Sequence, residues 1–392
     1  MIVSRPISST RLIRTYNAST VLRVLYKHGS CSRSQLTKLT GMSPATITRI
    51  IAELMEQEIV LEGKVGKSTG GRRPVYVHID YTKVYIGSVK LLQDDCAIAI
   101  LDLRGQIIER ERIVPHTLEP KILLQQVINS LNGLLEHCRI NREHILGVGV
   151  AVSGVCDSDH GVVLNSVNLG WRDVPVTEIL SGGLDLPVYL ENDANASALA
   201  ELWFGQATDA TNSMFIKTET GAGVGIIVNK TLLTGPNFMA GEIGHVPLVP
   251  NGQPCRCGQR GCLEPYVYFG DIQTRYQEKT NMLIDQEEFI KLVHGGDQCA
   301  LELVHETASA LALACAHWGI LTDMDIITIG GLWSQFNEEV MIYCQDYYNS
   351  VLESTGISRS IRIVGTKFGD DTDLLGAAGL VVSHWLTPQS VP

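Results

Sequence analysis

The sequence lacks a run of about 18 apolar residues that could span a lipid bilayer, and residues 1–10 lack the apolar core of a secretory signal. Its ten cysteines do not form the closely spaced set of a disulfide framework, because seven stand alone in apolar or helical surroundings. We therefore expect a reduced, cytoplasmic protein without membrane insertion. The seven isolated cysteines are Cys31, Cys96, Cys138, Cys156, Cys299, Cys315 and Cys344.

Acidic residues are scarce in the first fifth of the 392-residue chain. Residues 1–79 contain 12 lysines and arginines against 4 glutamates, whereas the remainder contains 19 basic against 38 acidic residues. A basic segment joined to an acidic body is typical of a nucleic-acid-binding module fused to a body that does not bind nucleic acid. We predict a DNA-binding domain over residues 1–79.

Turn and cap signals in this basic segment follow the order of a helix-turn-helix. The pattern predicts a helix over 12–28, a short helix to Leu39 capped by Ser32, a turn at Gly41, and a helix from Ser43 to about residue 57. Strands over 59–62 and 75–79 follow. The residues between them, 64–74, contain glycines and cations and predict a wing that contacts phosphates or the minor groove.

The last of these helices has an apolar stripe, Ile47, Ile50, Ile51 and Leu54, which should face inward. Its amino-terminal end then faces outward and can meet base edges. The alternative is a small helical oligomerisation domain with a solvated basic face. The candidate DNA contacts are Ser43, Ala45, Thr46, Thr48 and Arg49 in the helix and Lys67, Arg72 and Arg73 in the wing.

A cluster of metal-ligand residues lies between Gly241 and Glu264. Three thiolates and one imidazole are the ligands of a structural zinc site, which we predict once per chain. Two carboxylates, Glu242 and Glu264, lie beside the ligands and suit a polyhydroxylated molecule. Three buried cysteines and an ordinary core histidine are the alternative interpretation. The predicted zinc ligands are His245, Cys255, Cys257 and Cys262.

The acidic body alternates strand-like and helical patterns, which predicts an α/β fold. A buried strand over 145–152 ends at Ser153-Gly154, and a short strand over 187–190 leads to a loop with Asn192, Asp193 and Asn195. Polar groups at the carboxyl end of a strand are candidates for a ligand site. Asp193 can accept a proton from a hydroxyl, although helix capping is an equal alternative for Asp193 and Asn195. The turn over 220–225 is a weak phosphate signal and is often only a hairpin.

Taken in order, six motifs resemble the ROK family of repressors and sugar kinases, and specifically its winged-helix regulators of the glucose and N-acetylglucosamine repressor type. The motifs are Asn168-Leu-Gly-Trp171, Glu191-Asn-Asp-Ala-Asn195, Gly221-Ala-Gly-Val-Gly225, Gly241-Glu-Ile-Gly-His245, Cys255-x-Cys-Gly-x-x-Gly-Cys262-Leu-Glu264, and Gly330-Gly331 after an apolar strand.

The resemblance implies a winged helix followed by a two-lobed, actin-like ATPase fold with a structural zinc site. We expect a first lobe over 80–196, completed by a carboxyl-terminal helix over 372–386, and a second lobe over 197–371 with the zinc loop and a dimerisation surface. The sugar would bind between the lobes, near Ser153-Gly154. The family's sugar contacts correspond to Asn168, Asn192, Asp193, Glu242, His245 and Glu264.

The sequence departs from the family's kinases at the nucleotide site. Those kinases have an Asp-x-Gly-Gly-Thr loop for ATP and magnesium, whereas the aligned stretch here is Lys90-Leu-Leu-Gln-Asp94. No Gly-Gly pair is present, and a cation replaces the carboxylate on the magnesium side. We therefore expect no ATP binding and no catalysis, with Asp193 as a vestigial general base.

These observations predict a sugar-responsive transcriptional regulator, a repressor of carbohydrate uptake or catabolism genes. Its partners would be palindromic operator DNA, a sugar or sugar phosphate, and a second copy of itself in a homodimer or dimer of dimers. One alternative is an active sugar kinase with an appended DNA-binding domain. Another is a regulator that is sequestered by a sugar-transport protein.

Overall fold

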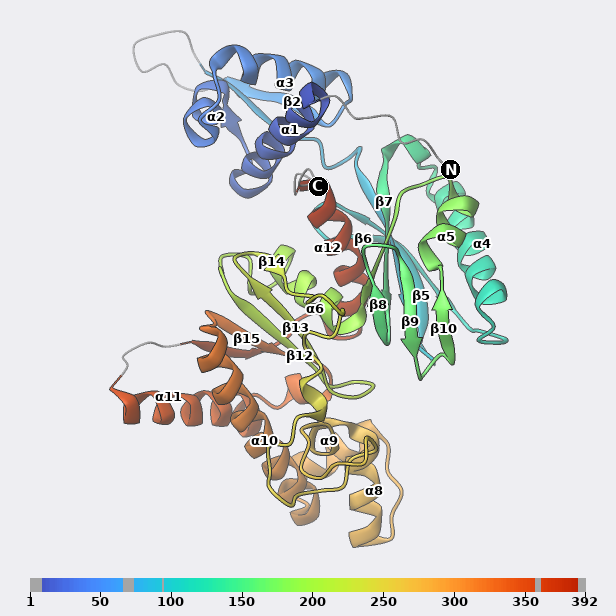
Figure 1. The fold of residues 1–392 in the computed structure, drawn as a ribbon, viewed down its shortest axis with the longest axis vertical. Helices are drawn as coiled ribbons and strands as arrows, with labels where there is room; N and C mark the ends of the chain where they lie inside the picture. Colours follow the sequence, from blue (N-terminus) through green and yellow to red (C-terminus); the bar gives the residue numbers. More distant parts are fainter. Residues whose placement is uncertain (1–8, 66–73, 94, 357–360, 387–392) are drawn as a thin grey trace.

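The computed structural model describes residues 9–65, 74–93, 95–356 and 361–386. A small amino-terminal domain lies at one end of the molecule, followed by two α/β lobes, each built on a five-stranded sheet (Figure 1). The winged-helix and actin-like organisation expected from the sequence is present.

The amino-terminal domain has three helices and a three-stranded sheet in the order β1-β3-β2. Ser32 caps α2 with a capping box, Gly41 ends it with a left-handed φ of 72°, and Ser43 caps α3 ahead of Pro44. These local signals confirm the predicted helix-turn-helix. The elements are α1 (Ser9–His28), β1 (Cys31–Ser32), α2 (Arg33–Thr40), α3 (Pro44–Glu56), β2 (Val60–Val65) and β3 (Val75–Ile79).

The first lobe has a mixed sheet in the order β11-β7-β4-β5-β6, whose strands β11, β7 and β4 are parallel. Helices α4 and α5 pack on one face, where residues such as Leu131 and Val150 are fully buried. A small sheet, β10-β9-β8, extends from this lobe. The elements are β4 (Tyr85–Leu91), β5 (Cys96–Asp102), β6 (Ile107–Ile113), α4 (Pro120–Cys138), β7 (Ile145–Val152), β8 (Val155–Asp157), β9 (Val162–Ser166), β10 (Trp171–Val174), α5 (Val176–Leu184) and β11 (Val188–Asn192).

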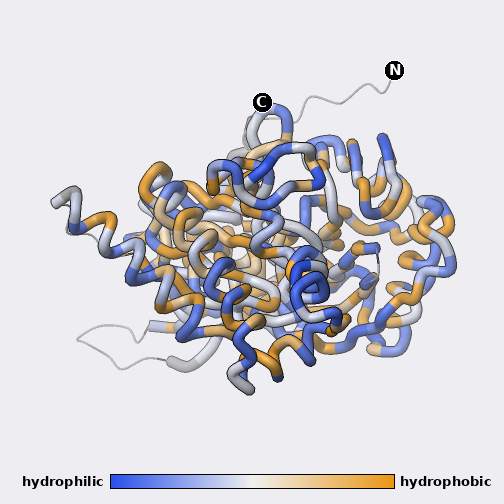
Figure 2. Tube along the Cα trace, turned by 90° about the horizontal axis from the view of Figure 1, so that it is seen from below, coloured by the Kyte–Doolittle hydropathy of each residue, from blue (hydrophilic) through white to orange (hydrophobic). Residues whose placement is uncertain are grey.

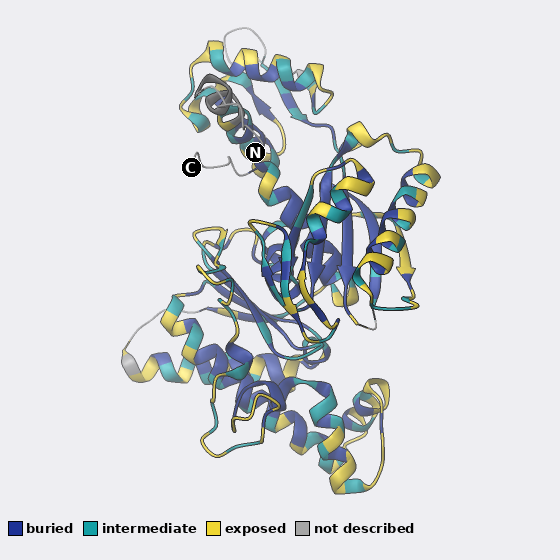
Figure 3. Cartoon of the chain, turned by 45° about the vertical axis from the view of Figure 1, so that its right-hand side comes forward, coloured by how far each residue is buried: buried dark blue, intermediate teal, exposed yellow. Residues whose placement is uncertain are grey.

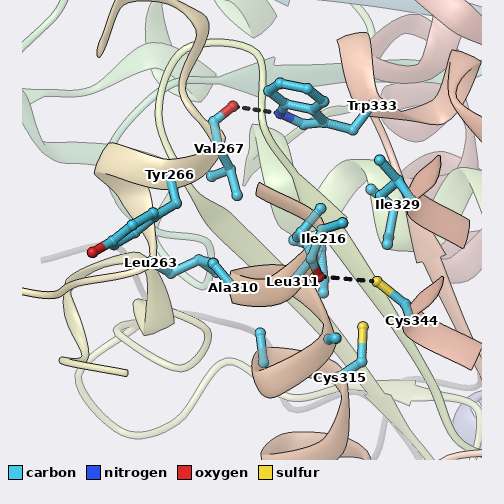
Figure 4. Close-up of a cluster of buried hydrophobic side chains, with 14 of the residues drawn as sticks. Ile216, Leu263, Tyr266, Val267, Ala310, Leu311, Cys315, Ile329, Trp333 and Cys344 are labelled. Atoms are coloured by element: carbon cyan, nitrogen blue, oxygen red, sulfur yellow. Dashed lines mark hydrogen bonds between the residues drawn. The ribbon is translucent and has the colours of Figure 1, made fainter. Parts of the chain in front are cut away.

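The second lobe has a sheet in the order β14-β13-β12-β15-β16. Its outer face packs against α7, α8, α10 and α11, with Trp333 donating its indole N–H to the Val267 carbonyl at 2.6 Å (Figure 4). The elements are β12 (Ser213–Lys217), β13 (Gly223–Val228), β14 (Thr231–Leu232), α7 (Glu264–Val267), α8 (Phe269–Thr280), α9 (Gln286–His294), α10 (Gln298–Thr322), β15 (Ile326–Ile329), α11 (Tyr343–Thr355) and β16 (Arg362–Gly365).

Two helices, α6 (Asp193–Trp203) and α12 (Thr372–Leu386), lie between the two sheets. Their residues are almost all buried, whereas the peripheral helices alternate buried and exposed positions (Figure 3). Hydrophilic and hydrophobic residues also alternate along the peripheral helices (Figure 2). Small residues allow close contacts: a Cβ at Gly149 of β7 would lie 1.8 Å from the carbonyl oxygen of Ala377 in α12. The predicted carboxyl-terminal helix thus returns to the first lobe.

Helix α10 is long and apolar enough to cross a membrane by length and composition alone. However, 61% of its most apolar window is buried inside the protein, where residues such as Leu311 have no exposed surface. It is the central helix of the second lobe's core.

Candidate functional site

A cavity of about 460 Å³ lies between the lobes and is lined by every residue of the predicted sugar set. The carboxyl ends of the parallel strands β7 and β11 supply Ser153-Gly154 and Asp193, because Val152 pairs with Asn192 across the sheet. The turn between β9 and β10 supplies Asn168, whose amide donates to the Ser153 hydroxyl at 3.0 Å. The residues brought together are Asn168, Asn192, Asp193, Glu242, His245 and Glu264.

Asn192 and Asp193 do not lie in a loop, as the sequence suggested, because β11 ends at Asn192 and α6 begins at Asp193. Asn192 is the helix cap: its side-chain oxygen accepts from the backbone N–H groups of Ala194 and Asn195. The N-cap is thus neither Asp193 nor Asn195, although Asp193 Oδ1 also accepts from the Ala194 backbone N–H at 3.1 Å. The Asp193 side chain remains at the cavity wall, at the positive end of the helix dipole.

Asp193 belongs to a buried ionic network that the sequence did not indicate. The Lys217 ammonium lies 2.6 Å from a carboxylate oxygen of Asp373, 3.6 Å from Glu219 and 3.9 Å from Asp193. Lys90 lies 2.5 Å from Asp95 and 3.7 Å from Asp373. Lys90, Asp193, Lys217 and Asp373 are each less than 7% exposed.

Burial raises the pKa of Asp193 to about 7; Lys217 opposes this shift, and the Asp373 and Glu219 carboxylates add to it. For Lys217, burial alone would lower the pKa, but the three surrounding carboxylates raise it well above its usual value. Lys217 is therefore charged, and its charge holds the negative groups of the network together.

The opposite wall of the cavity comes from the second lobe. Glu264 is 3% exposed and accepts from the Arg256 Nε at 2.7 Å and from the Ala222 backbone N–H at 3.3 Å. A Cβ at Gly221 would lie 2.9 Å from a Glu264 carboxylate oxygen, so the glycine of this turn allows the close approach. The turn joins the antiparallel strands β12 and β13, which matches the hairpin interpretation of the sequence.

The cysteine loop brings three of the four predicted zinc ligands together: the ligand atoms of His245, Cys255 and Cys257 all lie within 4.8 Å of one another. Cys262 does not belong to this group, although its Sγ lies 3.8 Å from Cys257 Sγ. Cys255 Sγ lies 3.6 Å from His245 Nδ1. Zn–S and Zn–N bonds of about 2.3 and 2.0 Å at tetrahedral angles give separations of about 3.8 Å between two sulfurs and about 3.5 Å between sulfur and nitrogen. Imidazole and thiolate groups are donors that suit zinc, and the pairs named here lie close to these separations.

The inward stripe of α3 is confirmed, because Ile47, Ile50, Ile51 and Leu54 are at most 4% exposed. At the outer surface, Ala45, Thr48 and Arg49 are exposed and Thr46 is half-buried. Ser43 is exposed, but its hydroxyl caps the helix by accepting from the Thr46 N–H at 3.2 Å. The predicted wing contacts Lys67, Arg72 and Arg73 lie outside the described residues, as does Asp94.

Two protein-family models match this chain. The family model described as "ROK family" matches residues 86–384, more than half of the chain. The chain belongs to the ROK family. A second model, described as "MarR family", matches residues 15–61, the region of the helix-turn-helix.

Individual members of the ROK family resemble this chain along different lengths. The xylose repressor of Caldicellulosiruptor bescii is 27% identical over 96% of this chain and 98% of its own length. A glucokinase of Halalkalibacterium halodurans is 29% identical over 72% of this chain and 91% of its own. Among solved structures, a ROK family transcriptional regulator, a homologue of the Escherichia coli MLC protein, has a TM-score of 0.84 at 23% identity, covering 96% of this chain and 97% of that one.

Proposed function

We propose that this ROK protein is a transcriptional repressor that binds operator DNA through its winged helix and a sugar through the cavity between its lobes. The observation that carries the proposal is that six residues from distant parts of the sequence line one cavity in a chain that also exposes the start of a recognition helix. A repressor of this kind works in the cytoplasm, where its operator is. The full-length similarity to a xylose repressor supports a carbohydrate regulon.

The effector that fits the cavity is an unphosphorylated sugar. The lining contains the carboxylates of Asp193, Glu242 and Glu264, which accept hydrogen bonds from hydroxyl groups. Its two fixed cations are already paired, Arg256 with Glu264 and Lys217 with Asp373. A phosphate brought among these groups would meet more negative than positive charge, whereas a neutral polyol would not.

Zinc is the metal that we propose for the cysteine loop. Gly261, with φ of 78°, allows the loop to fold tightly, because a Cβ there would lie 1.8 Å from the Val249 carbonyl oxygen. His245 would bind through Nδ1, the atom beside Cys255, which fixes the orientation of its ring at the cavity wall. Zinc would supply structural rigidity here, since four protein ligands leave no open position for chemistry.

Sugar kinase activity is the second candidate, favoured by the buried Asp193 and by the similarity to a glucokinase. Phosphoryl transfer from ATP needs a divalent cation beside the phosphates. In this chain Asp193 lies 3.9 Å from the Lys217 ammonium, and Asp373 lies 2.6 Å from Lys217 and 3.7 Å from Lys90. A magnesium ion would have to share them with two ammonium groups, so we expect sugar binding without turnover.

The following measurements test the proposal. Isothermal titration with neutral pentoses, hexoses and amino sugars, beside their phosphates, should give saturable binding of a neutral sugar and weaker binding of its phosphate. Fluorescence anisotropy with a labelled palindromic operator should show tight, salt-dependent binding that the same sugar weakens.

Formation of a phosphorylated sugar in the presence of Mg-ATP would identify a kinase. Binding of no sugar would favour control by a partner such as a sugar-transport protein. The proposed homodimer, or dimer of dimers, is tested by sedimentation.

A further inference from the structure

Helices α6 and α12 both begin at the buried ionic network and end at the winged-helix domain (Figure 1). Asp193 is the first residue of α6, and Asp373 is the second residue of α12. At this end, the Ser197 hydroxyl of α6 donates to Asp373 at 3.1 Å and the Lys217 ammonium donates to it at 2.6 Å. Any change in the partners of Lys217 therefore acts directly on the start of α12.

At the other end, α12 holds the first helix of the DNA-binding domain. Arg23 of α1 donates from Nε and Nη2 to the Leu386 carbonyl oxygen at 3.3 and 3.0 Å. The Ser19 hydroxyl of α1 donates to the Trp385 carbonyl oxygen at 3.4 Å. A cation at the carboxyl terminus of a helix also interacts favourably with the helix dipole.

The end of α6 makes a second connection to α1. The rings of Tyr26 and Trp203 pack edge to face with centroids 5.6 Å apart, and the Trp203 indole N–H donates to Ser383 of α12 at 2.6 Å. One continuous apolar cluster joins the domains here, because Leu25 of α1 packs in the same core as Val382 of α12. The two domains therefore share a core at this contact.

Between these ends, α6 and α12 pack backbone against backbone. A Cβ at Gly376 would lie 2.3 Å from the Ala196 carbonyl oxygen, and one at Gly379 would lie 3.0 Å from that of Leu199. Fifteen helical residues span about 22 Å at 1.5 Å per residue. Helices whose backbones are in contact, as those of α6 and α12 are, move as one body, because protein interiors are dense and deform little. By contrast, the Glu58–Lys83 ion pair between the domains is partly exposed and contains no residue that lines the cavity.

We propose that the α6–α12 pair transmits occupancy of the cavity to the winged helix, with Asp373 and Arg23 as the positioning residues at its two ends. The inference rests on the proposed function and specifies how that site is regulated. A sugar hydroxyl that donates to Asp193 changes the hydrogen bonding around Lys217, which shifts Asp373 and the start of α12. The displacement reaches α1 through the Leu386 carbonyl and tilts the recognition helix relative to its operator.

Operator affinity with and without saturating sugar tests the winged-helix end of this path. We expect a response of about tenfold in the unchanged protein, within the usual range of coupling. Arg23→Met should reduce the response to less than about threefold while the sugar dissociation constant in the absence of DNA stays unchanged. The matched control is Arg33→Met, since Arg33 pairs with Glu62 inside the same domain. An equal response in the Arg23 and Arg33 variants would overturn the inference.

The cavity end is tested without any sugar. Asp373→Asn should change operator affinity severalfold, although Asp373 lies in the lobes, at the opposite end of α12 from the winged helix. Glu306→Gln, which alters an ion pair with Arg275 in the second lobe, should leave operator affinity unchanged. Unchanged affinity in a folded Asp373→Asn protein would refute the coupling path. If no sugar alters operator affinity in the unchanged protein, the proposed function fails. The Asp373→Asn test still decides whether the start of α12 is coupled to the winged helix, because it uses no sugar.

Discussion

Replacement of Lys217 by methionine should destabilise the protein by an amount that depends on pH. The change removes a cation that lies within 4 Å of the carboxylates of Asp193, Glu219 and Asp373. Removing one partner of a buried ion pair costs about 3–5 kcal/mol, because the charge that remains is not compensated. We expect a larger loss near pH 8, where Asp193 of the unchanged protein is ionised, than at pH 5.

At lower pH the variant can neutralise its unpaired charge by taking up a proton. The pKa of Asp193 is already raised to about 7, and it rises further in the variant because Lys217 lowered it. A carboxyl group whose pKa is higher in the folded state than in the unfolded state stabilises the fold at low pH, and this contribution is lost as pH rises. Each pKa unit is worth about 1.4 kcal/mol, but only the part of the rise that lies below pH 8 affects a comparison of pH 8 with pH 5. The destabilisation should therefore be about 1.4 kcal/mol smaller at pH 5 than at pH 8.

Urea denaturation followed by tryptophan fluorescence at pH 5, 6.5 and 8 measures this difference. Lys279→Met is the control: Lys279 pairs with Glu302 at 3.1 Å, but both side chains are about half exposed, so its loss should cost less than about 1 kcal/mol at each pH. A destabilisation by Lys217→Met that is the same at pH 5 and pH 8, or larger at pH 5, would show that the network is not held together by this lysine.

Three further changes follow from the structure. Arg49→Ala at the exposed start of α3 should weaken operator binding at least tenfold and lower its salt dependence, measured by anisotropy over a range of salt concentrations. Cys257→Ser should lower the zinc content below one ion per chain by mass spectrometry under native conditions and lower the melting temperature, whereas an unchanged zinc content contradicts the site. Gly379→Ala should reduce the operator response to sugar, because its Cβ would lie 3.0 Å from a backbone carbonyl; Gly133→Ala, which meets no atom within 4 Å, should not.

The parts of the fold that were predictable from the sequence are those determined by local contacts. Ser32 and Ser43 cap their helices with their own hydroxyls, and Gly41 supplies a left-handed turn, so the helix-turn-helix could be predicted from neighbouring residues. Strand β1 could not, since two residues form a strand only through pairing with β3. Strand β6 was also missed, because three of its central residues are charged and exposed and its pairing with β5 determines it.

The candidate site could also be predicted only in part from the sequence. Motifs that resemble a family located the cavity residues, because each motif is a continuous stretch with a distinctive order. Lys217 and Asp373 were not found, since they are separated by 156 positions and only the fold brings them together. A lysine at the end of the apolar strand β12 was the only signal, and an apolar strand with a terminal lysine is common on protein surfaces.

The Lys217–Asp373 ion pair connects the two properties that we propose: sugar binding without phosphoryl transfer, and coupling of the cavity to the winged helix. Asp373 faces two ammonium groups, at 2.6 and 3.7 Å, and therefore has less capacity to bind a divalent cation than an unpaired carboxylate. The same pairing joins the cavity wall to the first turn of α12, because Lys217 lines the cavity and Asp373 belongs to the helix. We therefore expect this pairing with lysines to weaken the binding of the metal that phosphoryl transfer requires, and we propose that it couples the cavity to the helix that reaches the DNA-binding domain.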